Sequence, residues 1–419
     1  MQRVAKKLRR LLLILLTLTI MLVFTGCGQK SEVAEVNPLE QDWDSIVSHS
    51  RGTTVNFYMW GGDERINSWV DNYAAQKMKE RYNITVNRVP MEAPEFINKL
   101  LGEKQVNRQK GSIDLLWING ENFRTARQAD MLWGPFAEHI PNFNKYVDKD
   151  APDIAFDFGF PVEGYEVPYG KAQFVFAYDT ARVSNPPKSS GELFDWAKAN
   201  PGRFTYPELP DFTGSVFIRH LMYELCGGYE AFPYVEEVNK EELNQQLQPL
   251  WDYLNQIKPY LWRQGRTYPS QIAQLDQLFA DGEVDFNMSY HPSKFSGMIE
   301  LGVLPNTVRT FVWENGTIGN THFLAIPFNA PNKGGAMVLA DFLLSPEAQI
   351  SKFDPILWGD MIALDIDKLE PGYLQEIEGI DLGIATLSAE ELANHRLPEI
   401  ASAYIEVIED LWRENVIKE

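Results

Sequence analysis

Apolar and polar positions change their spacing along the chain in a regular way. Residues 54–59 form a β-prone run, and the stretch 64–82 places apolar side chains at helical spacing behind an acidic start. Further strands are predicted at 84–89, 113–118, 173–178, 284–288 and 321–327, and further helices at 95–105, 191–200, 215–225, 236–257, 270–281 and 335–344. Strands that alternate with helices of this length are typical of parallel βαβ units. The pattern therefore predicts an α/β protein.

The first 26 residues follow a different pattern. Five Arg and Lys residues lie within residues 1–10, and residues 11–24 are almost entirely apolar. This apolar run is shorter than a bilayer span, and small residues follow it, as in a secretory signal. An N-terminal membrane anchor is the alternative. Phe24-Thr25-Gly26-Cys27 resembles a bacterial lipobox, in which the chain is cut before a cysteine that then carries lipid.

This interpretation gives a signal peptide over 1–26, a lipid on Cys27 and a polar tether over 27–52. Cys226 then has no partner, and in its apolar helical stretch it is interpreted as a buried hydrophobe rather than a nucleophile. The 393 residues that follow the signal are too many for one ordinary core, so two domains are expected.

Charge narrows the choice of partners. Removal of the signal takes the formal charge from −20 to −25. Such a charge argues against nucleic acid and against an anionic membrane surface as partners.

The candidate binding residues follow from the predicted sheet. Parallel sheets bind ligands beyond the carboxyl ends of their strands. Three loops occupy such places: 59–63, 119–122 and the loop that follows the next strand. The first two, with the end of the strand before 59–63, supply Tyr58, Trp60, Gly61, Asn119, Glu121 and Asn122. Core packing is the alternative for Tyr58, and helix capping is the alternative for the second loop. A helix start can also offer free N–H groups to a ligand.

Four further candidates lie later in the chain. Thr213 and Ser215 open a predicted helix, where they could bind a ligand oxygen or cap the helix. Tyr290 ends a predicted strand. Asn315 precedes another strand and either faces the ligand or belongs to a surface loop. Because the candidates are rich in aromatic rings, a heteroaromatic, sugar-like or amine-bearing ligand would suit them.

Several motifs, together with their order along the chain, resemble those of the type II periplasmic binding proteins of family 1. They are VPYGKAQFVFAYD at 167–179, NTHFLAIP at 320–327 and ADFLLSPEAQ at 340–349. Three others resemble the YnjB-like subgroup: NFYMWGGD at 56–63, DLLWINGENFR at 114–124, and FTYP with DFTGS at 204–215. The likeness runs from about residue 53 to the end.

The resemblance implies two α/β lobes with a hinge and an interlobe cleft that closes on a small molecule. From this resemblance we expect lobe 1 at 53–168 plus 293–345 and lobe 2 at 169–292. A C-terminal helical segment at 346–419 could pack on either lobe. Two or three crossings are expected: near 168–173, near 290–293, and in the three-crossing case a further one late in the chain. Tyr169 and Gln173, at the first crossing, are expected to line the cleft.

The resemblance further implies a monomeric, extracytoplasmic lipoprotein of an ABC import system, which hands its ligand to permease subunits. A secreted lipid-anchored hydrolase that acts on a polymer is the alternative. The chain has no Gly-x-Ser-x-Gly, His-Glu-x-x-His or Walker motif, and its six histidines lack metal-ligand spacing. No catalytic residue, metal or cofactor is therefore expected, and the ligand's identity stays open.

Overall fold

The computed structural model describes residues 37–417. Contacts divide the chain into a unit up to Gln41, whose described part holds the short helix η1 (Pro38–Glu40), and a compact unit from Asp42 onward. The second unit is described below. The predicted signal peptide and Cys27 lie outside the described residues. Within residues 37–417, no helix has both the length and the apolar character needed to cross a bilayer.

The folded body begins earlier than the sequence suggested. α2 spans Trp43–Ser50, and its cap Asp42 accepts the backbone N–H of Ser45 at 2.9 Å. Ile46 is 2% exposed, and α2 packs against α15 (Lys333–Leu343). The tether predicted over 27–52 is therefore wrong from Asp42 onward. A buried face of α2 holds this segment on the body, and the helix is too short for a helical repeat of apolar residues to be visible in the sequence.

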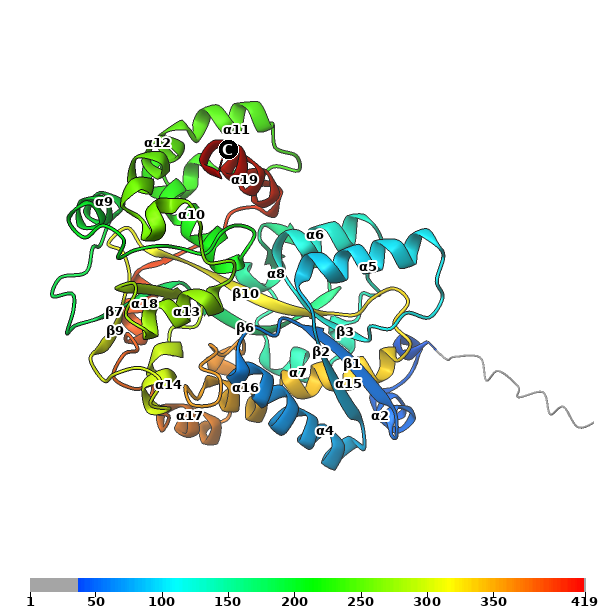
Figure 1. Cartoon of the computed structure of the whole chain (residues 1–419). Helices are drawn as coiled ribbons and strands as arrows, with labels where there is room; N and C mark the ends of the chain where they lie inside the picture. The colour runs from blue at the N-terminus through cyan, green and yellow to red at the C-terminus, as the bar shows by residue number, and fades with distance from the viewer. Residues whose placement is uncertain (1–36, 418–419) are drawn as a thin grey trace, which may run out of the picture. The chain divides into compact units, whose positions relative to one another are not determined.

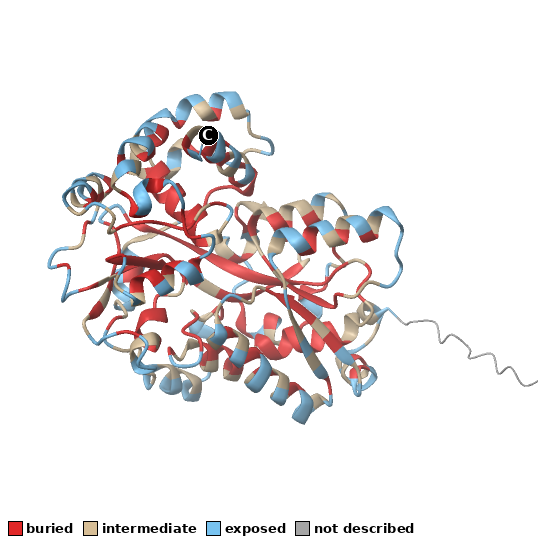
Figure 2. Ribbon diagram, in the orientation of Figure 1, coloured by how far each residue is buried: buried red, intermediate tan, exposed pale blue. Residues whose placement is uncertain are grey.

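The larger sheet has six strands: β1 (Thr54–Met59), β2 (Thr85–Pro90), β3 (Leu115–Ile118), β6 (Glu166–Gln173), β10 (Thr317–Ala325) and β11 (Arg396–Leu397). β1 lies between β2 and β3 and is parallel to both, with Phe57 opposite Leu115. β10 runs antiparallel to β3 and to β6. Every residue of β10 is buried, as Figure 2 shows along its length.

Helices cover both faces of this sheet (Figure 1). α5 (Ala93–Gln105) and α6 (Gly120–Gln128) pack apolar side chains against β1 and β3 on one face. α4 (Ala75–Tyr82), α15 and α16 (Pro346–Phe353) lie on the other, and a π-helical turn η2 (Trp69–Ala74) joins α4 to α3 (Glu64–Ser68). Short elements complete this part: α7 (Pro141–Tyr146), α8 (Pro152–Ala155), β4 (Phe156–Asp157) and β5 (Phe160–Pro161).

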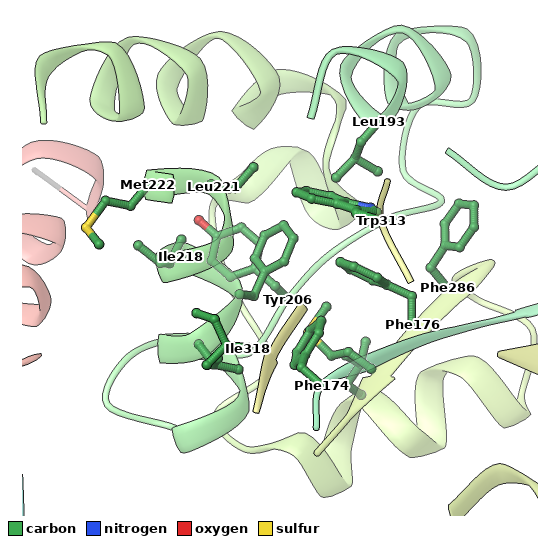
Figure 3. Packing of buried hydrophobic residues seen from close by; sticks show 14 of the residues in the cluster. Phe174, Phe176, Leu193, Tyr206, Ile218, Leu221, Met222, Phe286, Trp313 and Ile318 are labelled. Carbon is green, nitrogen blue, oxygen red and sulfur yellow. The ribbon is translucent and has the colours of Figure 1, made fainter. Parts of the chain in front are cut away.

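The smaller sheet has the order β8-β7-β9, formed by Phe286–Ser289, Val175–Asp179 and Val308–Phe311, all antiparallel. Its helices are α9 (Ser190–Ala199), α10 (Phe212–Leu225), α11 (Lys240–Gln246), α12 (Gln248–Ile257), α13 (Ile272–Ala280) and α14 (Lys294–Glu300). Phe176 on β7 stacks between Phe311 and Trp313, with ring centroids 5.2 and 5.0 Å away. Figure 3 shows how this aromatic layer fills the space between the sheet and α10.

Two strands carry the chain between the sheets. β6 of the larger sheet ends at Gln173 and β7 of the smaller sheet begins at Val175, in the segment predicted to hold the first crossing. The return crossing was predicted near 290–293, but in the structure the chain returns to the larger sheet through β10. α14 and β9 still belong to the smaller sheet, since β9 pairs with β7. The predicted boundary between residues 292 and 293 is therefore wrong, because β9 finds its partner far away in sequence.

The C-terminal segment packs on both parts. On α16, the side chains of Gln349 and Lys352 donate to the carbonyl of Tyr169 on β6. α17 (Pro371–Glu378) packs on α16, and α18 (Ala389–Asn394) leads into β11, which pairs with the start of β10. α19 (Ile405–Trp412) and the π-helical turn η9 (Arg413–Ile417) return to α12 beside the smaller sheet. There, Trp412 Nε1 donates to the hydroxyl of Tyr206 at 3.3 Å.

Candidate ligand-binding site

Three helices begin where the two parts of the body meet, and an aspartate caps each of them. On α3, Asp63 accepts the N–H of Arg65 at 2.8 Å. On α6, Asp157 Oδ2 accepts the N–H of Gly120 at 2.6 Å. On α10, Asp211 Oδ1 accepts the N–H groups of Thr213 and Gly214, both at 2.9 Å. The chain's own carboxylates thus occupy the first free donors of these helices.

Aromatic rings join the two parts at this place. Phe158, which follows β4, packs against Phe212 at the start of α10, with ring centroids 6.2 Å apart. Phe212 in turn lies 5.1 Å from Tyr290, at the end of β8. The backbone N–H of Ser402 donates to the carbonyl of Phe158 at 2.8 Å, so the C-terminal segment also takes part in this contact.

A buried polar group, here called the Arg219 cluster, lies behind these rings. The guanidinium of Arg219 makes two bonds to the carboxylate of Glu399, at 2.8 and 2.9 Å, and one to Ser215 Oγ at 2.7 Å. Ser215 donates to Glu409 at 2.8 Å, and the hydroxyl of Tyr290 donates to Glu399 at 3.2 Å. The cluster is Arg219, Ser215, Tyr290, Glu399 and Glu409.

Burial works against the charged form of Arg219, but the carboxylate of Glu399 outweighs it, so the guanidinium pKa is raised above its ordinary value. Arg219 is 1% exposed, and its charge is held by partners rather than by water.

Two carboxyl groups of the larger part face this cluster without full partners. Glu121 Oε1 accepts from Asn122 at 2.8 Å, whereas its buried Oε2 has no hydrogen-bond partner among the described residues. Asp157 is 1% exposed, and its Oδ1 is likewise unpartnered there. Burial, and then the charge of Glu409, raise the pKa of Glu121 to about 8. Burial, with Glu121 and Glu399 nearby, also raises the pKa of Asp157 well above its ordinary value.

Trp60 and Gly61 directly follow β1. Trp60 is partly buried and packs against the core of the smaller part. Its ring lies over Gly62, where an added Cβ would stand 2.3 Å from a ring carbon, so only glycine fits there. Gly61 backs onto Pro90 in the same way, at 2.6 Å.

The structure brings several predicted residues together and leaves others apart. Ser215 and Tyr290 belong to the Arg219 cluster, Glu121 and its neighbour Asn122 lie within electrostatic reach of it, and Asn119 and Thr213 lie at the starts of α6 and α10. Trp60 packs against the core of the smaller part. Four residues lie elsewhere: Tyr58, Tyr169, Gln173 and Asn315.

The reasons for those four placements are physical. Tyr58 packs in the core under α5 and α6, with its hydroxyl 3.3 Å from Ser112 Oγ. The amide of Gln173 is 1% exposed and donates to the carbonyl of Leu392 at 2.8 Å. Asn315 is exposed on a turn. For Tyr58 and Asn315, the packing and surface-loop alternatives are therefore the correct ones.

Tyr169 belongs to a second buried group, on the face of the sheet that α16 covers. It is fully buried between Trp117, His322 and Trp358, with ring centroids 5.4–5.5 Å away. Asp360 holds this group together, because its carboxylate accepts from Lys352 Nζ at 2.6 Å and from His322 Nε2 at 3.1 Å. Burial opposes ionisation of Asp360, but these two neighbours hold its pKa well below the ordinary value.

Sequence reasoning missed Arg219, Glu399, Asp157 and Phe212. Arg219 left one signal, since it is the lone charged residue in the apolar run 216–222. His220 beside it is a satisfied imidazole: it accepts from the N–H of Ile318 at 2.7 Å, and its other nitrogen is 2.8 Å from the carbonyl of Val216. Burial lowers its pKa to about 3.

A separate pocket of about 310 Å³ lies among Asp148, Lys171 and Asp365, and none of the predicted site residues line it.

A fold of two α/β lobes joined by β6 and β10, with partly partnered polar groups and aromatic rings where the lobes meet, defines a ligand-binding protein. The sequence model of the family described as bacterial extracellular solute-binding protein matches residues 73–360, and the chain belongs to this family. YnjB of Escherichia coli (strain K12) is 38% identical over 339 residues, which cover 80% of this chain and 86% of that protein.

Two solved structures show the same fold at low identity. The Tp0655 (TpPotD) lipoprotein of Treponema pallidum superposes with a TM-score of 0.62 at 14% identity, covering 87% of this chain and 100% of that one. The periplasmic binding protein AfuA of Actinobacillus pleuropneumoniae, with fructose-6-phosphate bound, has a TM-score of 0.59 at 14% identity, covering 87% and 98%. The predicted two-lobed periplasmic-binding-protein fold is confirmed.

By its family the chain is therefore an extracytoplasmic solute-binding protein and not an enzyme. The resemblance to the YnjB-like subgroup is confirmed, and the hydrolase alternative receives no support.

Proposed function

We propose that the protein captures a small solute between its two lobes, at the aromatic rings in front of the Arg219 cluster, and delivers it to ABC permease subunits. Lobe 1 comprises the larger sheet with α2–α8, α15 and α16, and lobe 2 comprises the smaller sheet with α9–α14 and α19. One observation carries the proposal. Buried polar groups of both lobes meet there, and carboxyl oxygens of Glu121 and Asp157 stay unpartnered among the described residues.

A buried polar atom without a partner is costly, and native structures seldom keep one unless a ligand, ion or water satisfies it. Phe212 and Tyr290 add flat apolar surface to those polar groups, as small-molecule sites commonly do, and we assign Trp60, which follows β1 directly, to the same site. Ligand contacts to both lobes would shift an open–closed equilibrium toward the closed form.

The test is a thermal-shift screen of the purified protein against amines, sugars, amino acids, oxyanions and metal ions. A ligand at about 100 times its Kd should add about 2.7 kcal/mol of stability. Trp60→Ala should weaken that ligand at least about tenfold, because an aromatic contact of about 1.4 kcal/mol or more is lost. Asn315→Ala, on the exposed turn, is the matched control and should bind like the wild type. Equal affinities in the two variants would place the ligand elsewhere.

We further propose that Cys27 carries a lipid that holds the protein at the outer face of the cell membrane. The support is the lipobox-like sequence Phe24-Thr25-Gly26-Cys27 behind a secretory signal. Cell fractionation and intact-mass measurement test this. The wild type should sediment with membranes and carry a diacylglyceryl mass, and Cys27→Ser should lack that mass. A mature wild-type chain without the lipid mass would overturn the assignment.

A further inference from the structure

The starts of α3, α6 and α10 are poor places for an anionic ligand. Helix starts attract phosphates and carboxylates because their N–H groups are free and the helix dipole is positive there. Here Asp63, Asp157 and Asp211 already accept the first N–H groups of these three helices. An incoming anion would meet carboxylates instead of donors.

Carboxyl groups outnumber cations around the proposed site. The guanidinium of Arg219 is taken up by Glu399, its partner in two hydrogen bonds. Glu121, Asp157 and Glu409 lie within electrostatic reach of one another or of the cluster, and no second cation of the described residues is bonded to them. The site is therefore richer in carboxyl groups than in positive charge.

Two atoms point to a ligand in addition to this surplus. Among residues 37–417, Glu121 Oε2 is buried without a hydrogen-bond partner, and so is Oδ1 of Asp157, a residue that is 1% exposed. The buried carboxyl group of Glu166, whose two oxygens are also unpartnered there, lies within electrostatic reach of Asp157. An N–H donor or a cationic nitrogen placed here would satisfy Oε2 of Glu121 and Oδ1 of Asp157. The rings of Phe158, which directly follows Asp157, and of Phe212 pack together beside this region, and the face of an aromatic ring attracts a cation.

We infer that the solute is an organic cation, with a protonated or quaternary nitrogen held by Glu121 and Asp157, and that the site rejects phosphates and carboxylates. The inference rests on the proposed function, since it names the chemical class that this same site takes. A metal ion fits this site less well than an organic cation, because no group of three or more metal-ligating side chains forms among residues 37–417.

The competing explanation is structural. The carboxyl groups of Glu121 and Asp157 would then be protonated, bridged by water, and unconnected to any ligand. This explanation predicts that a neutral Gln or Asn at these positions leaves ligand selectivity unchanged, whereas a ligand role predicts a selective loss for cations.

Calorimetric titration of the purified protein, with melting shifts as a second readout, separates the two. The cationic probes are choline, putrescine and spermidine. The matched probes are 3,3-dimethyl-1-butanol, which is the neutral isostere of choline, and fructose-6-phosphate and citrate as anions. We expect at least one cation to bind and raise the melting temperature, and the isostere and both anions to bind at least about tenfold more weakly or not at all.

Glu121→Gln and Asp157→Asn should each weaken the bound cation at least about tenfold, because each removes a buried negative partner. Glu314→Gln, an acid on the exposed turn beside Asn315, is the matched control and should change nothing. Asp157→Asn also disturbs the cap of α6, so Glu121→Gln, which keeps shape and hydrogen-bonding capacity, is the decisive variant.

Mass spectrometry of molecules released from the denatured protein reads the charge of any co-purified solute directly. An anionic or neutral solute, found there or in the titrations, would overturn the cation assignment and leave the receptor function standing. Cation affinity unchanged in Glu121→Gln would overturn the role of that carboxylate. No binding and no released solute in any class would overturn the proposed function itself.

Discussion

Arg219→Met tests whether the charge pair with Glu399 organises the region where the lobes meet. The wild-type guanidinium is 1% exposed and makes four hydrogen bonds, two to Glu399 and one each to Ser215 and Tyr290. Methionine keeps much of the side-chain volume but leaves the buried carboxylate of Glu399 without its cation.

The size of the effect follows from burial. Removing one partner of a buried ion pair costs about 3–5 kcal/mol, since the remaining charge is left desolvated and unpaired. Unfolding entropy near the melting temperature is about 2.1 cal/mol/K per residue, or about 0.8 kcal/mol/K for a body of this size. We therefore expect the variant to melt about 5 °C below the wild type.

Differential scanning calorimetry of three variants provides the assay. Arg413→Met removes the cation of an exposed pair with Asp410, and should cost at most about 0.5 kcal/mol. Arg219→Met with Glu399→Leu should recover most of the loss, because two apolar side chains need no charge partner. An Arg219→Met protein that melts within 1 °C or so of the Arg413→Met control would refute this reasoning.

Three further predictions follow from other parts of the molecule. In this structure burial, and then the charge of Glu409, raise the pKa of Glu121 from 4.5 to about 8. If opening the proposed cleft returns Glu121 to water and to its ordinary pKa, closure of the ligand-free protein should cost about 1.4 kcal/mol more per pH unit between those values. Small-angle X-ray scattering should find the ligand-free protein more compact at pH 5 than at pH 8, and Glu121→Gln should abolish the difference. Phe176→Ala should lower the unfolding free energy by about 3–5 kcal/mol, because it empties the space between Phe311 and Trp313. Ile46→Ala should lower the unfolding free energy by about 2–4 kcal/mol because α2 is part of the body; differential scanning calorimetry measures the loss for this variant and for Phe176→Ala. An unchanged unfolding free energy for Ile46→Ala would return that segment to the tether.

The sequence alone determined the features that rest on local pattern. Strand β1 and helix α9 lie within a residue of their predicted bounds, because a β-prone run or a period of 3.6 is a property of neighbouring residues. Trp60 and Glu121 were predicted as site residues for a related reason, and that assignment stays a prediction. Trp60 directly follows one strand of the parallel part of the sheet and Glu121 lies three residues after another, and the carboxyl ends of such strands meet at one edge.

Only the tertiary structure decided which distant residues meet. Glu399 and Glu409 come from a C-terminal segment whose lobe could not be assigned, yet they complete the surroundings of Arg219 on α10. β9 joins the smaller sheet through a partner far away in sequence, and this moved the lobe boundary to β10. Such pairings depend on which buried charges and strand edges need partners once the core has formed. The spacing of apolar residues within one segment does not say which distant segment will supply the partner.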